Sequence, residues 1–104
     1  MKKILIIVTV MALGAAAHAA DPAAGKEKSK TCAACHGENG ISQAPEFPKL
    51  AGQYSDYLVR ALSDYKSGAR KNPIMSALVT SLTKQDIADL AAYYASQNAL
   101  ATKY

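Results

Sequence analysis

The most reactive side chains of the sequence lie together in one short segment, Cys32-Ala33-Ala34-Cys35-His36. Two thiols separated by two residues and followed directly by an imidazole form the C-x-x-C-H pattern that attaches a c-type haem. Each thiol can add to one vinyl group on a porphyrin edge, and the imidazole after them then lies beneath the ring, where it can reach the iron. The pattern therefore predicts one covalent haem, attached through Cys32 and Cys35 and ligated by His36.

Three other uses of these residues have to be weighed. A disulfide between Cys32 and Cys35 would close too short a loop to constrain the unfolded chain much. A thioredoxin-like redox pair would need a preceding strand and a βαβ setting, which the sequence does not predict. A zinc site would need a fourth ligand, and from residue 20 onward the chain has no other Cys or His. Haem attachment is the interpretation that uses both thiols and the imidazole.

Met75 is the candidate for the second axial ligand. It is the only Met from residue 20 onward, and it comes 39 residues after His36 on a predicted loop that could fold over the opposite haem face. Haem irons that transfer electrons commonly have Met opposite His. A lone Met more often fills a gap in a hydrophobic core, but the haem motif and the lack of a second His favour ligation. We therefore predict His36 and Met75 as the two metal ligands.

Residues 1–19 have the features of a cleaved secretory signal peptide. Two lysines precede a short apolar run, and the segment Ala17-His18-Ala19 matches the small-residue pattern of a cleavage site. The apolar run is shorter than the roughly 20 residues that a membrane-spanning helix needs, which argues against an uncleaved anchor. We predict a signal peptide over 1–19, a single domain over 20–104, and a periplasmic location.

Composition and charge exclude several classes of protein. Of the 104 residues, 50% are hydrophobic and 19% are charged, which excludes a disordered chain. The length indicates one domain and excludes a multi-domain enzyme. The formal net charge of +4 falls to +2 once the two lysines of the signal peptide are removed. So small a charge on an exported chain does not support a nucleic-acid partner.

Helices must position the reactive side chains, because no segment has the alternation of polar and apolar residues expected of a strand. A first helix is predicted from Pro22 to about Cys32, with Asp21 as its N-cap. Segment 37–52 contains three glycines and two prolines, and we predict that it forms a loop.

A second helix is predicted over 54–65, where apolar residues recur with helical spacing. Gly68 is the residue expected to end it. The Asn-Pro pair at 72–73 is interpreted as a break in the chain, with a short apolar piece after it at 74–79.

The last helix is predicted from its capping residues. Thr83 with Asp86 three residues later is a variant of the capping box, and the apolar stripe expected to be buried is Ile87, Leu90, Ala91 and Tyr94. The predicted fold is therefore all-α, with three principal helices and two long loops. A domain this small has a thin core and often recruits a cofactor to complete it.

Nearly all of the chain from residue 20 onward resembles the class I cytochromes c. Within that class it looks more like the small bacterial periplasmic monohaem type, or like one half of a tandem dihaem cytochrome c. The segments that carry the resemblance are Cys32 to Gly37, Pro45, Phe47 to Gln53, Tyr57-Leu58, Leu62, Ser67 to Arg70, Asn72 to Met75 and Asp86 to Tyr94.

The resemblance implies a cytochrome c fold, in which three principal helices and long loops surround one covalently bound haem c. It implies that the carbonyl of Pro48 accepts a hydrogen bond from Nδ1 of His36, which would fix the imidazole ring. It also implies that Leu50 packs on the haem. The expected cofactor-binding residues are thus Cys32, Cys35, His36, Met75, Pro48 and Leu50, and no catalytic residue is expected.

The resemblance also implies a crossing between the first and last helices. A tyrosine, Tyr93 or Tyr94, would pack there against a small residue, either Gly25 or Ala24. One departure concerns this crossing: many members of the family have an aromatic residue four positions before the first Cys, where this chain has Lys28.

The function implied is that of a one-electron carrier of the respiratory chain, not an enzyme. It would shuttle electrons between respiratory or dehydrogenase partners as a monomer, with no membrane span after cleavage. The expected partners are redox proteins, a donor and an acceptor, such as membrane oxidase or reductase complexes. One alternative is a haem c subunit of a periplasmic dehydrogenase complex. Another is a haem enzyme or gas sensor, which would require that Met75 does not ligate.

Overall fold

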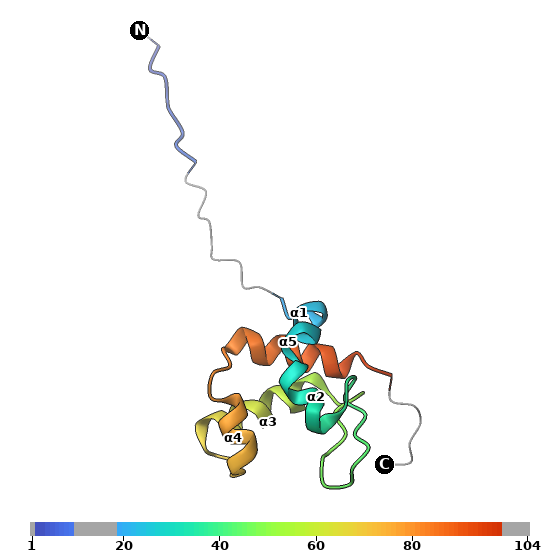
Figure 1. The fold of residues 1–104 in the computed structure, drawn as a ribbon. Helices are drawn as coiled ribbons and strands as arrows, with labels where there is room; N and C mark the ends of the chain where they lie inside the picture. Colours follow the sequence, from blue (N-terminus) through green and yellow to red (C-terminus); the bar gives the residue numbers. More distant parts are fainter. Residues whose placement is uncertain (1, 10–18, 99–104) are drawn as a thin grey trace.

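The computed structural model describes residues 2–9 and 19–98, and every regular element in these ranges is an α-helix. In chain order the helices are α1 (Pro22–Lys28), α2 (Lys30–His36), α3 (Ser55–Ser67), α4 (Pro73–Val79) and α5 (Lys84–Ala95) (Figure 1). The all-α prediction is confirmed. None of the described helices is both long and apolar enough to span a bilayer. The predicted cleavage site lies partly in 10–18, outside the described residues, so the signal peptide stays a prediction.

The single helix predicted over 22–32 is in fact two helices. Asp21 caps α1 as predicted, but the helix is interrupted at Ser29. The hydroxyl and the backbone N–H of Ser29 both donate to the carbonyl of Lys26, at 2.7 and 3.3 Å. A serine that satisfies its own hydrogen bonds in this way competes with the regular helix pattern. The chain then forms α2, which carries the motif and continues to His36.

α3 and α5 begin and end close to where the sequence predicts. α3 ends at Gly68, whose φ of 86° lies in the left-handed region that glycine adopts without strain. In α5, the backbone N–H of Asp86 donates to the Thr83 hydroxyl at 3.0 Å, and that of Thr83 donates to the Asp86 carboxylate at 2.9 Å. The predicted stripe on α5 is buried, and Tyr93 and Asp89 are buried beside it.

α1 lies against α5, as Figure 1 shows, and the contact centres on Gly25. A Cβ atom on this residue would overlap the backbone carbonyl of Asp89 and lie 2.7 Å from Cβ of Tyr93. The resemblance allows Gly25 or Ala24 on one side of this contact and Tyr93 or Tyr94 on the other. The structure shows that the pair in contact is Gly25 and Tyr93. Only a residue without a side chain allows the two helices to approach so closely.

A buried carboxylate completes this contact. Asp89 is 2% exposed and accepts hydrogen bonds from Nζ of Lys28 at 2.6 Å, the N–H of Asp21 at 2.8 Å and Nε2 of Gln85 at 2.8 Å. Lys28 also pairs with Asp86 at 2.9 Å. The hydrogen bond from Lys28, and after it that from Asp21, lowers the pKa of Asp89 to about 2. Lys28, the residue that departs from the family pattern, thus links the first helix to the last through these two ion pairs.

The loop over 37–52 is tied back to the helices at Gly40. The carbonyl of Gly40 accepts the N–H groups of Leu50 at 2.8 Å and Ala51 at 3.1 Å. Gly40 has a φ of 81°, and a Cβ atom there would lie 2.7 Å from the ring of Tyr94. The N–H of Gly52 donates to the carbonyl of Tyr94 at 2.9 Å. The loop therefore closes on itself and against α5.

Candidate haem site

One cavity of about 560 Å³ lies between α2, the loop, α3, α4 and α5. Its volume is typical of small-molecule and cofactor pockets, which measure roughly 300–1,000 Å³. The apolar face predicted for α3 forms one of its walls, so this face is turned toward the cavity, and Leu58 is its buried member. The lining includes every predicted cofactor-binding residue, namely Cys32, Cys35, His36, Pro48, Leu50 and Met75.

α2 places the motif on the cavity wall. Cys32, Cys35 and His36 are spaced i, i+3 and i+4, which puts their side chains on one side of a helix. Both cysteines are free and half-buried. Burial raises the pKa of the Cys32 thiol. The two thiols are therefore not joined to each other, and both border the cavity.

The ring of His36 is held by the loop. His36 is 7% exposed, and its Nδ1 lies 2.7 Å from the carbonyl oxygen of Pro48. A carbonyl can only accept a hydrogen bond, so Nδ1 carries the proton and Nε2 is the ring nitrogen with a lone pair for a metal. This is the hydrogen bond that the resemblance implies.

α4 brings Met75 to the same cavity. Asn72 is the N-cap of this helix, and its Oδ1 accepts the N–H groups of Ile74 at 3.0 Å and Met75 at 3.1 Å. The predicted break falls between α3 and α4, but the prediction that Met75 lies on a loop is wrong, because a helix begins at Pro73. The missed signal is a capping residue with a proline directly after it at the first helical position, the same pattern that precedes α1.

Arg70 is a lining residue that the predicted ligand set does not include. Its Nη1 donates to the Tyr57 hydroxyl at 3.3 Å, and its guanidinium carbon lies 4.8 Å from the centre of the Tyr65 ring. Lys49 also lines the cavity. These two cations suit a ligand that carries carboxylates as well as an apolar body. Lys28, in contrast, is engaged by Asp86 and Asp89 away from the cavity.

Tyr94 carries the one buried side-chain polar atom that lacks a partner among the described residues. Tyr94 lines the cavity, and burial, followed by the neighbouring Cys32 thiol, raises the pKa of its hydroxyl. An unsatisfied buried group in an otherwise well-bonded structure commonly marks the place of a missing water or ligand.

An apolar cavity with two thiols, an imidazole, a thioether and two cations has the donor set that a haem c requires.

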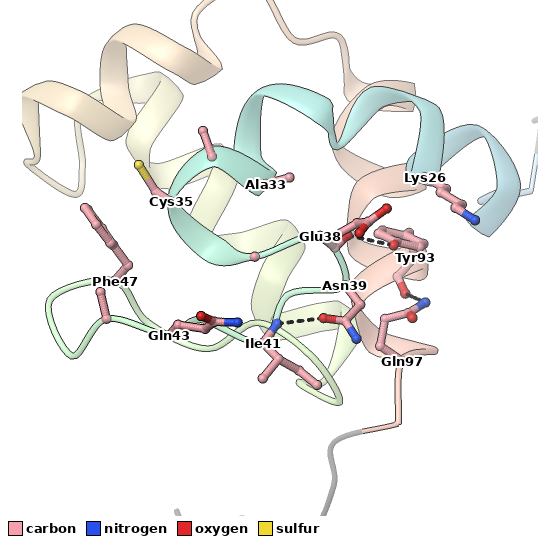
Figure 2. A pocket seen from close by; sticks show the side chains of 13 residues that line it. Lys26, Ala33, Cys35, Glu38, Asn39, Ile41, Gln43, Phe47, Tyr93 and Gln97 are labelled. Carbon is pink, nitrogen blue, oxygen red and sulfur yellow. Dashed lines mark hydrogen bonds between the residues drawn. The ribbon is translucent and has the colours of Figure 1, made fainter.

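A second hollow, of about 760 Å³, lies on the other side of the motif (Figure 2). Cys35 and Phe47 line both hollows. Two polar side chains of the second hollow have partners nearby: the Tyr93 hydroxyl donates to the carbonyl of Glu38 at 3.0 Å, and Gln97 donates to that of Tyr93 at 3.0 Å. Neither proposed iron ligand lines it, so it is a surface groove beside the haem site.

An all-helical fold whose cavity joins C-x-x-C-H to a methionine defines the class of small haem c proteins. Residues 22–98 match the family model of cytochrome c. Cytochrome c4 of Pseudomonas aeruginosa is 50% identical over 99 residues, which are 93% of this chain and 49% of that protein. Cytochrome c-554(548) of Halomonas halodenitrificans is 45% identical over 82 residues, 76% of this chain and 99% of that protein. This chain belongs to the cytochrome c family.

The fold agrees with that assignment. The crystal structure of reduced recombinant cytochrome c4 from Pseudomonas stutzeri matches with a TM-score of 0.74 and 44% identity, over 77% of this chain and 47% of that one. The chain thus spans about half the length of the cytochrome c4 relatives that it matches and resembles one half of a dihaem cytochrome c4. Family membership and the motif together identify one haem c, covalently attached through Cys32 and Cys35.

Proposed function

We propose that this chain is a periplasmic one-electron carrier whose haem iron is held between His36 and Met75. The observation that carries the proposal is the single cavity that both residues line together with the two motif thiols. When bound, the haem supplies the one-electron change between ferric and ferrous iron. If His36 and Met75 both hold the iron in either oxidation state, the structural change on electron transfer would be small.

The residues around the cavity support this role. Pro48 holds the His36 ring in one orientation through the hydrogen bond to Nδ1. Leu50 and the apolar face of α3 line the cavity and would shield a bound haem from water, which limits solvent reorganisation and raises the reduction potential. Arg70 is placed to pair with a haem propionate at the cavity wall. In this account the chain positions and shields the haem, and no residue acts as an enzyme catalyst.

Export through the predicted signal peptide over 1–19 would deliver the domain over 20–104 to the periplasm. The partners we propose are redox proteins, and the matches to cytochromes c support that class. A protein of Thiomonas intermedia named thiosulfate dehydrogenase electron acceptor is 38% identical over 95 residues. This likeness favours a second candidate, in which the chain accepts electrons as a bound subunit of a periplasmic dehydrogenase.

The proposal is tested on holoprotein purified from periplasm. We expect one haem per chain by the pyridine haemochrome assay, and an intact mass equal to residues 20–104 plus one haem. The ferric protein should have the near-infrared band of Met-to-iron ligation, and Met75→Ala should lose it. A wild-type protein that lacks the band and binds carbon monoxide rapidly would contradict the carrier and favour the haem enzyme or sensor. Recovery only as part of a larger complex would favour the subunit.

A further inference from the structure

Asn72 connects the fold to the proposed Met75 ligand. Its Oδ1 accepts hydrogen bonds from the N–H of Ile74 and from that of Met75 itself, and so caps the first turn of α4. Pro73 occupies the first helical position, where its ring presets φ and no helical hydrogen bond is lost. Met75 is the third residue of the helix, inside the turn that this cap holds.

The first turn of α4 has little other support. The helix has seven residues, a length at which an isolated helix is not stable in water. Its buried residue is Val79, at the opposite end, whereas Ile74 is 63% exposed. The turn that contains Met75 therefore depends on its cap more than on packing.

We propose that Asn72 is a positioning residue for the sixth iron ligand. By capping α4, it keeps the Met75 side chain at the cavity wall in both oxidation states. The inference rests on the proposed function, since it requires that Met75 binds the iron. Without the cap the first turn would fray, and removal of a cap of typical strength would raise the fraction of molecules with the sulfur away from the iron about fivefold.

The test compares Asn72→Ala with Thr83→Ala in the holoprotein. Both variants remove a capping side chain, but Thr83 caps α5, which carries no proposed ligand. The rate at which carbon monoxide binds the ferrous protein reports the fraction with the sulfur away. We expect this rate to be about fivefold faster in Asn72→Ala and unchanged in Thr83→Ala. Asn72→Asp retains an acceptor oxygen and should restore the wild-type rate.

Equal rates in Asn72→Ala and the wild type would overturn the inference, as would equal acceleration in both alanine variants. A wild-type ferric protein without the near-infrared band would instead contradict the proposed function, so the two failures are distinguishable. Amide hydrogen exchange provides a second test, which is measured on the wild type and so does not require any variant to fold. The amides of Ile74 and Met75 should be protected, and exchange at the rate of free amides would also overturn the inference.

Discussion

His36 and Met75 reach the same cavity with different amounts of support. The His36 ring is 7% exposed and hydrogen-bonded directly to the carbonyl of Pro48. Met75 is half-buried, and the contacts that fix its place act on its backbone through Asn72. At the scale of single residues, we therefore expect the bond between Met75 and the iron to break more readily than the bond between His36 and the iron.

Arg70 should raise the reduction potential of the haem. A positive charge at the cavity wall favours the ferrous state, so Arg70→Met is expected to lower the potential by roughly 40 mV, equivalent to a Coulomb interaction of about 1 kcal/mol. Redox titration in the presence of mediators measures it. Arg60→Met is the matched control, because Arg60 pairs with Asp64 at 3.2 Å outside the cavity. An equal shift in both variants would contradict a specific role for Arg70.

At the scale of elements, two similar sequence patterns led to different predictions. Asp21 with a proline directly after it correctly predicts the start of α1, whereas the same arrangement at Asn72 predicts only a break in the chain. The difference lies in the residues beyond each proline, since the segment over 74–79 is too short to show a helical period. The interruption at Ser29 could not be predicted, because it depends on a hydroxyl that turns to the carbonyl of Lys26.

Gly25→Ala should destabilise the contact between α1 and α5. The added methyl group would overlap backbone atoms of Asp89, which cannot move without moving α5. We expect a loss of about 3 kcal/mol in the free energy of unfolding, the upper part of the range for overpacked sites. Denaturant unfolding measures it. Gly68→Ala is the control: its φ of 86° strains an alanine, but the space around it is open, so a loss of about 1 kcal/mol is expected. Equal losses would contradict the steric explanation.

The Asp89 carboxylate should make the stability of the fold depend on pH in acid. Its pKa of about 2 in the folded chain lies below the value of about 3.9 for an unfolded aspartate. Its contribution is therefore complete above about pH 4 and is lost as the pH falls toward 2. Unfolding midpoints in urea between pH 2 and 6 measure this slope. Asp89→Asn should flatten the slope in part, because the pKa of Asp86 is also lowered; an unchanged slope would refute the assignment.

At the scale of the whole molecule, few large side chains are fully buried, and we expect the haem to fill the space that a hydrophobic core fills in other domains. Leu90 is the one large side chain less than 2% exposed among the described residues. All six predicted cofactor-binding residues line one cavity. The sequence predicts Cys32, Cys35 and His36 from the motif and Met75 as the only Met from residue 20 onward, and it predicts Pro48 and Leu50 through the resemblance. It did not predict that the apolar face of α3 borders a cavity, because periodicity identifies an apolar face but not what covers it.

A chain that cannot attach haem should lack a cooperative fold. The double variant Cys32→Ser, Cys35→Ser retains every helix-forming residue, yet the cavity of about 560 Å³ would have no covalently held occupant. We expect far-ultraviolet circular dichroism to show reduced helix content and a broad thermal transition, because domains this small often need a bound cofactor for stability. The wild-type holoprotein is the control. A sharp transition at the wild-type temperature would show that the polypeptide folds without its haem.

The contact between α1 and α5 also bears on the order in which the chain folds and binds its haem. Lys28 and Asp89 are 61 residues apart in the chain, and contacts of such long sequence separation form late because a large loop must close first. The motif segment comes directly after α1, and its own helix α2 forms from local contacts. Both thiols would therefore be reachable while the contact between α1 and α5 has not yet formed. Haem attachment would belong to that interval, before the last helix docks.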